Sequence, residues 1–170
     1  MTQNTDTRRR GHGSHDSLAA GFTLIEILMV MGIIALLAAV VIVAINPARQ
    51  FAQARNSQRV SNVNSLLNAV GQNIADHRGV FECEAGDLPT EATVIKSELE
   101  DGYDLAPCIT PLYLPAMPFD PSAPEAHFTD ISDYDTGYTL IQDADTGRIT
   151  IAAPFAQNMA ELGEDIEATR

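Results

Sequence analysis

Residues 21–45 read GFTLIEILMVMGIIALLAAVVIVAI, an almost wholly apolar stretch that carries one charged residue. From Ile27 to Ile45 it has nineteen consecutive uncharged residues, close to the roughly 20 needed to cross a bilayer core of about 30 Å. Glu26 stands near its start. A carboxylate at the centre of a membrane helix costs about 2.5 to 3.5 kcal/mol, and less near the end, so a chain keeps one only where something depends on it. The stretch therefore predicts a membrane-spanning helix with a functional acid near one end.

The residues before this helix are polar. Residues 1–20 are rich in Gly, Ser and Thr and carry three consecutive arginines, Arg8 to Arg10, which is typical of a leader and not of a fold element. A secretory signal is the weaker interpretation, because its apolar run usually spans only about 7 to 15 residues.

A second helix is predicted over residues 46–79. Asn46-Pro47 is typical of a helix start with a cap and a first-turn proline, and also of a kink inside one long helix. Beyond it, apolar residues recur at spacings of three and four, which indicates an amphipathic helix with one apolar stripe: Val60, Val63, Leu67, Val70 and Ile74. We expect His77 and Arg78 in its last turn, with Gly79 just after the cap.

Charge divides the rest of the chain sharply. Residues 46–79 have a net charge of +3, whereas residues 80–170 hold nineteen acidic residues against three basic ones, a net charge of −16. An acidic surface repels nucleic acid and anionic lipid head groups, which disfavours DNA binding by the isolated C-terminal part. The basic stretch after the apolar run is the only candidate for contact with a polyanion.

Two further features bear on the compartment and the fold of the C-terminal part. Cys83 and Cys108 are the only cysteines, and this pair fits one disulfide in an oxidising compartment, with two free cytosolic thiols as the alternative. Residues 137–153, GYTLIQ-DADTG-RITIAA, predict an antiparallel hairpin. The acidic tail, residues 157–170, suggests at most a short frayed helix, to which we assign no function.

The N-terminal stretch resembles the type III signal of bacterial type IV pilins and type II secretion pseudopilins. In that signal a polar, basic leader ends in a glycine, here Gly21. A phenylalanine follows that becomes the new N-terminus, here Phe22, and a glutamate stands at the fifth mature position, here Glu26. A generic spanning helix has no reason to keep these three residues in that register.

The resemblance implies that a prepilin peptidase cleaves between Gly21 and Phe22 and that the new amine of Phe22 is N-methylated. The subunit would wait in the inner membrane, N-terminus inside, and join a homo-oligomeric filament through an assembly platform and minor pilins or pseudopilins. Glu26 would pair with the Phe22 amine of a neighbouring subunit, where weak screening makes the attraction sensitive to register. An interfacial glutamate reaching the head groups is the alternative.

The implied fold class is α+β. A long N-terminal helix, with a spanning half at 22–45 and an amphipathic half at 46–79, would pack on a small antiparallel sheet in an acidic domain at 80–156. The run YLPAMPFDP at 113–121 also loosely resembles the proline-rich segment of major pseudopilins, whose sheet loop holds calcium. Carboxylates that could serve as ligands lie at Asp130, Asp133 and Asp135, although Asp-x-Asp-Thr-Gly is ordinary turn chemistry and turns are the favoured interpretation.

The sequence does not favour an enzyme. It has no G-x-S-x-G, H-E-x-x-H, Walker loop or C-x-x-C motif, and His127 stands in a predicted loop. The prediction is a type IV pilin-like filament subunit. A type II secretion pseudopilin is the alternative within the family, and a single-pass anchored binding domain that never polymerises is the alternative outside it.

Overall fold

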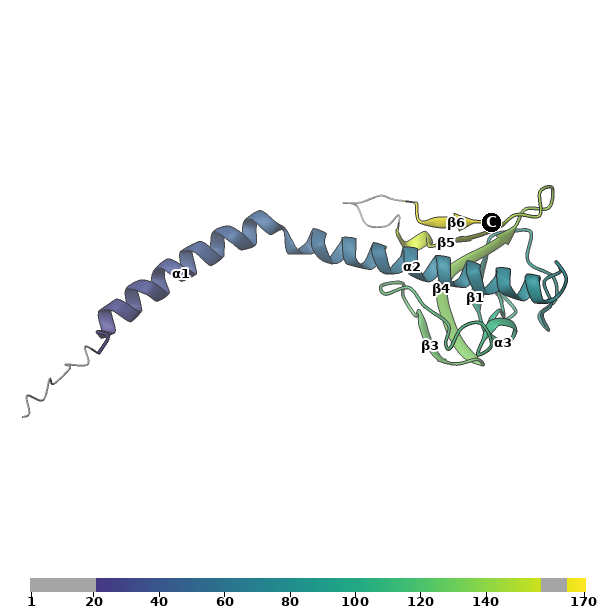
Figure 1. Cartoon of the computed structure of the whole chain (residues 1–170), viewed down its shortest axis with the longest axis horizontal. Coiled ribbons are helices and arrows are strands. Elements are labelled where there is room, and N and C mark those ends of the chain that lie inside the picture. Colours follow the sequence, from purple (N-terminus) through teal and green to yellow (C-terminus); the bar gives the residue numbers. More distant parts are fainter. Residues whose placement is uncertain (1–20, 157–164) are drawn as a thin grey trace, which may run out of the picture. The chain divides into compact units, whose positions relative to one another are not determined.

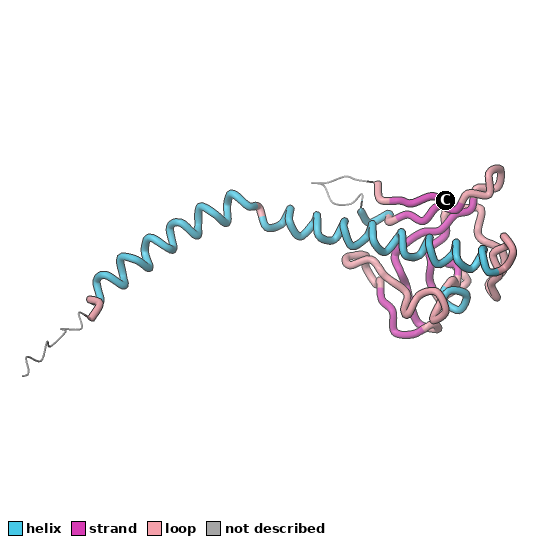
Figure 2. The backbone as a smooth tube through the Cα atoms, in the orientation of Figure 1, coloured by secondary structure: helices cyan, strands magenta, loops and turns pink. Residues whose placement is uncertain are grey.

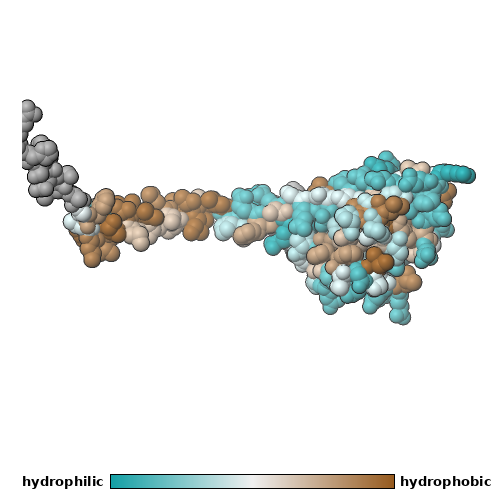
Figure 3. All heavy atoms as spheres, turned by 60° about the horizontal axis from the view of Figure 1, so that its bottom comes forward, coloured by the Kyte–Doolittle hydropathy of each residue, from teal (hydrophilic) through white to brown (hydrophobic). Residues whose placement is uncertain are grey.

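The computed structural model describes residues 21–156 and 165–170 and divides the chain into two compact units, Met1–Ala44 and Ile45–Arg170. The predicted leader, apart from Gly21, lies outside the described residues. The first unit contains all but the last residue of α1, Leu24–Ile45, a helix that is exposed at every residue. Its 22 residues span about 33 Å, and its surface is almost entirely hydrophobic (Figure 3). Within the described part of the chain, α1 alone is long and apolar enough to cross a membrane.

Near the start of the second unit, a helix boundary lies at Asn46. This residue has left-handed backbone angles, φ 46° and ψ 79°, and the Arg49 amide donates to its side-chain oxygen at 3.4 Å. Pro47 then starts α2, Pro47–Asp76. Of the two interpretations of Asn46-Pro47, the capped helix start is the one that the structure contains.

The far end of α2 falls slightly earlier than predicted. His77 is the C-terminal cap, so His77 and Arg78 follow the helix and do not form its last turn. Gly79 has φ 93°, a conformation that glycine adopts without strain, and its amide donates to the Ile74 carbonyl at 2.8 Å.

The buried face of α2 is more polar than the predicted stripe. Val63, Leu67 and Val70 are buried as expected and Ile74 is partly buried, but Val60 is 47% exposed. Towards the helix start the buried face continues through other residues at the same spacing: Ala52, Asn56 and Arg59. The predicted stripe of apolar residues therefore ends too early. Beyond it, Asn56 and Arg59 are polar but buried, because they bond each other and Arg59 also bonds the domain.

The domain contains a mixed sheet with strand order β2-β1-β4-β5-β6, and β3 pairs with β4 beside it (Figure 1). Most pairs are antiparallel as predicted, but β1 and β2 are parallel. The strands are β1 Thr93–Lys96, β2 Gly102–Tyr103, β3 His127–Asp130, β4 Asp133–Gln142, β5 Ile149–Ala152 and β6 Glu167–Thr169; two short helical segments are α3 Ala106–Ile109 and η1 Pro154–Ala156.

The predicted hairpin is confirmed by β4 and β5, in which Leu140 pairs with Ile151. The tail prediction is wrong where the structure describes it, because Glu167–Thr169 forms strand β6 along β5. Residues 157–164 lie outside the described part. α2 contacts β5 and β6, so the core lies between this helix and the sheet (Figure 2).

Candidate assembly segment and its supporting domain

The first turn of α1 is closed by a reciprocal pair of side chains. The Thr23 amide and hydroxyl both donate to Glu26 Oε2, each at 2.9 Å, and the Glu26 amide donates to the Thr23 hydroxyl oxygen at 3.3 Å. This is a capping box, in which a threonine and a glutamate three residues later satisfy helix-start donors. The letters TLIE carry that signature, and the sequence prediction missed it.

The residues of the predicted cleavage signal are accessible. Gly21 and Phe22 precede α1 in non-helical backbone, and the Phe22 side chain is 84% exposed. The helix therefore begins just beyond the Gly21–Phe22 bond, and Glu26 lies in its first turn.

The apolar surface of α1 has no covering in the described residues. Its exposed side chains include isoleucine, leucine, valine and methionine all around the helix. Soluble monomers rarely expose contiguous apolar patches larger than a few hundred Å². The segment is suited to a lipid environment or to packing against other apolar helices.

In the domain, a fully buried ion pair joins α2 to the proline-rich run. Arg59 Nε donates to Asp120 Oδ2 at 2.6 Å and its Nη2 donates to Oδ1 at 2.9 Å, with both side chains 0% exposed. Asn56 and Ser122 oxygens accept the remaining guanidinium bonds. Burial alone would raise the pKa of Asp120, but the Arg59 bonds and charge, with the Ser122 and Ala123 amides, hold it below its usual value.

The same run is attached at further points. The side-chain nitrogen of Asn62 donates to the Phe119 carbonyl at 3.0 Å and to the Tyr138 hydroxyl at 2.9 Å. The main-chain amide of Asp120 donates to the Thr136 carbonyl at 2.8 Å. Gly137 has φ 68°, and a Cβ there would stand 2.8 Å from that of Ala123. Residues 113–124 thus form an anchored part of the domain. Sequence reasoning missed this because the partners of Asn62 lie 57 and 76 positions away along the chain.

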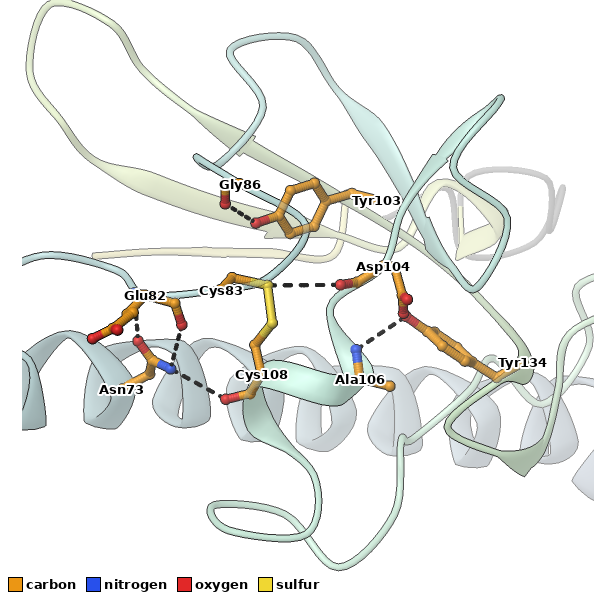
Figure 4. The surroundings of a disulfide bond; sticks show 9 residues. All are labelled: Asn73, Glu82, Cys83, Gly86, Tyr103, Asp104, Ala106, Cys108 and Tyr134. Atoms are coloured by element: carbon orange, nitrogen blue, oxygen red, sulfur yellow. Dashed lines mark hydrogen bonds between the residues drawn. A yellow bond between two sulfur atoms is a disulfide. The ribbon is translucent and has the colours of Figure 1, made fainter.

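The predicted disulfide between Cys83 and Cys108 is confirmed (Figure 4). Beside it, the Asn73 side chain bridges two segments. Its amide nitrogen donates to the carbonyls of Glu82 and Cys108 at 3.0 and 3.1 Å, and its oxygen accepts from the Glu82 amide at 3.0 Å. The end of α2 and the disulfide therefore tie the same two segments together.

A tyrosine and an aspartate secure the residues that lead into α3. The Tyr134 hydroxyl donates to Asp104 Oδ1 at 2.8 Å and accepts from the Ala106 amide at 3.0 Å (Figure 4). Burial raises the pKa of both side chains. These bonds keep the Cys108 side of the bridge in place.

The three aspartates of the predicted calcium loop are engaged separately. Asp130 accepts from the amide and hydroxyl of Ser132, Asp133 contacts His127 Nε2 at 3.1 Å, and Asp135 accepts from the Gly137 amide. Among the residues that the structure describes, no three acidic, histidine or cysteine side chains are arranged to hold a metal ion. Calcium binding therefore stays a prediction.

The candidate region for contact with a polyanion, residues 46–79, exposes few of its basic side chains. Arg59 is buried against Asp120 and Arg55 is half-buried, which leaves Arg49 and Arg78 as the exposed arginines of residues 46–79. These two stand at opposite ends of α2, so residues 46–79 present no continuous basic surface.

Comparison with known proteins gives one similarity to report. Over 90 residues, 53% of its length, the chain is 36% identical to the type IV major fimbrial protein FimA of Dichelobacter nodosus. The chain spans about half the length of this curated relative. No family model matches the chain, and no solved structure matches it. The relative is named as a fimbrial protein, and with the α+β arrangement this similarity supports a type IV pilin-like family for the chain.

Proposed function

We propose that the protein is a type IV pilin-like structural subunit that polymerises from the inner membrane into a helical filament. The observation that carries the proposal is α1, an apolar helix exposed at every residue and preceded by the accessible Gly21–Phe22 bond. The fimbrial relative adds support. In this proposal α1 is held by lipid before assembly and by other copies of α1 afterwards.

Processing precedes assembly in this proposal. A prepilin peptidase cuts between Gly21 and Phe22, and the Phe22 amine is methylated. Glu26 then pairs with the Phe22 amine of a neighbouring subunit. Its capping bonds do not prevent this, because both Thr23 donors use Oε2 and no described donor bonds Oε1. One oxygen is left for the amine while the other closes the helix.

The proposed topology places the N-terminus in the cytoplasm and the domain outside. The disulfide supports it, because such bonds persist in oxidising compartments. The assembly platform, the peptidase and minor subunits are the proposed partners.

The mass of the intact protein tests this function. For the full-length chain expressed with a prepilin peptidase and purified from membranes, we expect a mass that lacks residues 1–21 and gains one methyl group. Gly21→Val, which alters only the cleavage point, should keep the leader. An unprocessed wild-type chain would contradict the proposal and favour an anchored domain that never polymerises.

A pseudopilin of a type II secretion apparatus is the second candidate. The anchored run favours it, because its residues 113–121, YLPAMPFDP, loosely resemble the proline-rich part of major pseudopilins. The two candidates share the processing step, so electron microscopy of the cells separates them. Long surface fibres support a pilus, whereas short periplasmic fibres support a pseudopilus.

A further inference from the structure

An open cavity lies directly beside the disulfide. Its volume is about 430 Å³, and Cys83 and Cys108 both belong to its lining, together with Asn73 at the end of α2. Neither cysteine is fully buried. Thiol–disulfide exchange requires that a thiolate reach one sulfur of the bridge. The cavity therefore offers small thiols a route to the bridge in the folded domain.

The cavity is negatively charged on the Cys83 side. Glu82 and Glu84 precede and follow Cys83, and both are exposed and line the cavity. His77 Nε2 stands 3.4 Å from Glu82 Oε2 and offsets that carboxylate when it is protonated, so the negative charge rests mainly on Glu84. Among the lining residues that the structure describes, none is a lysine or an arginine. An ordinary thiolate, which is an anion, is repelled here unless it carries a positive group of its own.

The two sulfurs of the bridge have different surroundings. Cys83 lies between two glutamates, whereas Cys108 lies between Pro107 and Ile109, which carry no charge. A thiolate released at Cys83 would be destabilised by the adjacent carboxylates, so Cys108 is the better leaving group. The Asn73 side chain donates to the Cys108 carbonyl at 3.1 Å, which keeps a released Cys108 near Cys83 and makes the exchange reversible.

We propose that the bridge is a thiol-exchange site that favours small aminothiols, whose ammonium group offsets the charge of the thiolate. The thiolate attacks Cys83 Sγ, a new sulfur–sulfur bond forms there, and the bond between Cys83 and Cys108 breaks. The electron pair leaves on Cys108 Sγ, which then takes a proton from water. The aminothiol is the reductant, and it ends as a mixed disulfide on Cys83 with its ammonium group beside Glu84. The inference concerns the domain alone and does not depend on the proposed filament.

Exchange rates with thiols of different charge test the proposal. The oxidised full-length chain in a neutral detergent is treated at low ionic strength with cysteamine, 2-mercaptoethanol or 3-mercaptopropionate. The reactive thiolates of these reagents have net charges of about 0, −1 and −2, and each rate is divided by the thiolate concentration. Glu84→Gln should leave the cysteamine rate nearly unchanged. It should raise the 2-mercaptoethanol rate about threefold and the 3-mercaptopropionate rate about tenfold, as expected for one charge acting over several ångströms in water.

Two further measurements make the test specific. Glu91→Gln removes the same charge from an exposed residue outside the cavity lining and should change none of the three rates. In the wild-type chain, alkylation of the free thiol followed by peptide mapping should find cysteamine on Cys83 and the alkyl group on Cys108. High salt should reduce the differences between the reagents, because it screens exposed charges.

Each alternative outcome overturns a stated part of the proposal. Equal changes with all three reagents in Glu84→Gln, or the same changes in Glu91→Gln, overturn the charge selectivity. Cysteamine found on Cys108 overturns the direction of attack. A bridge that reacts only after denaturation overturns the site itself. None of these results bears on cleavage or filament formation, so the proposed function stands or fails separately.

Discussion

α1 and α2 both carry polar side chains beside apolar ones, but these side chains find their partners in different places. In α2, Arg59 and Asn73 are buried and bonded to distant parts of the same domain. In α1, Glu26 is exposed and bonds only Thr23 among the described residues. The polar groups of α2 therefore serve the fold of the single chain, whereas Glu26 stays available for the proposed ion pair with another chain.

The largest effect should come from breaking the buried ion pair. Asp120→Ala leaves Arg59 buried without its partner, which costs about 3 to 5 kcal/mol of the free energy of unfolding. Urea unfolding of the full chain in detergent, followed by circular dichroism, measures it. Asp145→Ala, at an exposed turn, is the control and should change the free energy by at most about 0.5 kcal/mol. Equal effects would remove the distinction between the two helices.

The disulfide should contribute slightly less to the free energy of unfolding than the buried ion pair does. Replacing Cys83 and Cys108 together by serine opens a loop of 25 residues, and we expect a loss of about 3 kcal/mol in the free energy of unfolding. Reduction of the wild-type chain should give the same loss in the same unfolding measurement. If neither treatment changes the free energy of unfolding, the hydrogen bonds of Asn73 hold the two segments together without the disulfide.

Low pH should reduce the stability of the domain, because Asp120 then becomes protonated and loses its ion pair with Arg59. Because the pKa of this carboxyl is held below its unfolded value, its contribution is complete above about pH 4 and is lost as the pH falls through the lower folded value. The melting temperature should therefore drop steeply below about pH 4. In Asp120→Asn this part of the drop should be absent, and an unchanged acid profile in that variant would contradict the assignment.

The smallest effect on the fold should come from Glu26. Glu26→Gln keeps a residue that completes a capping box but removes the charge, whereas Glu26→Ala removes both. Neither should alter the urea unfolding of the domain, yet both should lower the filament yield, measured by shearing and sedimentation. If Glu26→Gln assembles normally and Glu26→Ala does not, Glu26 acts as a cap and not as an ion-pair partner.

The sequence allowed α1, the hairpin and the disulfide to be predicted because each signal is local or, for two cysteines, has one solution. The Arg59–Asp120 pair could not be predicted in this way. Its members are 61 residues apart, and an arginine on a helix stripe ordinarily indicates the solvent side. The parallel pairing of β1 with β2 and the pairing of β6 with β5 could not be predicted either. These strands are short, and their pairing depends on the rest of the sheet. The capping box of Thr23 and Glu26 was readable from the letters alone.

The Asn73 bridge has a consequence for how the chain matures. By holding the main chain at Glu82 and Cys108, it gives the two thiols a high effective concentration before they are oxidised. Copies of the chain that meet before oxidation could otherwise form disulfides with one another. A single amide side chain thus biases oxidation toward the bridge within each subunit and away from covalent aggregates.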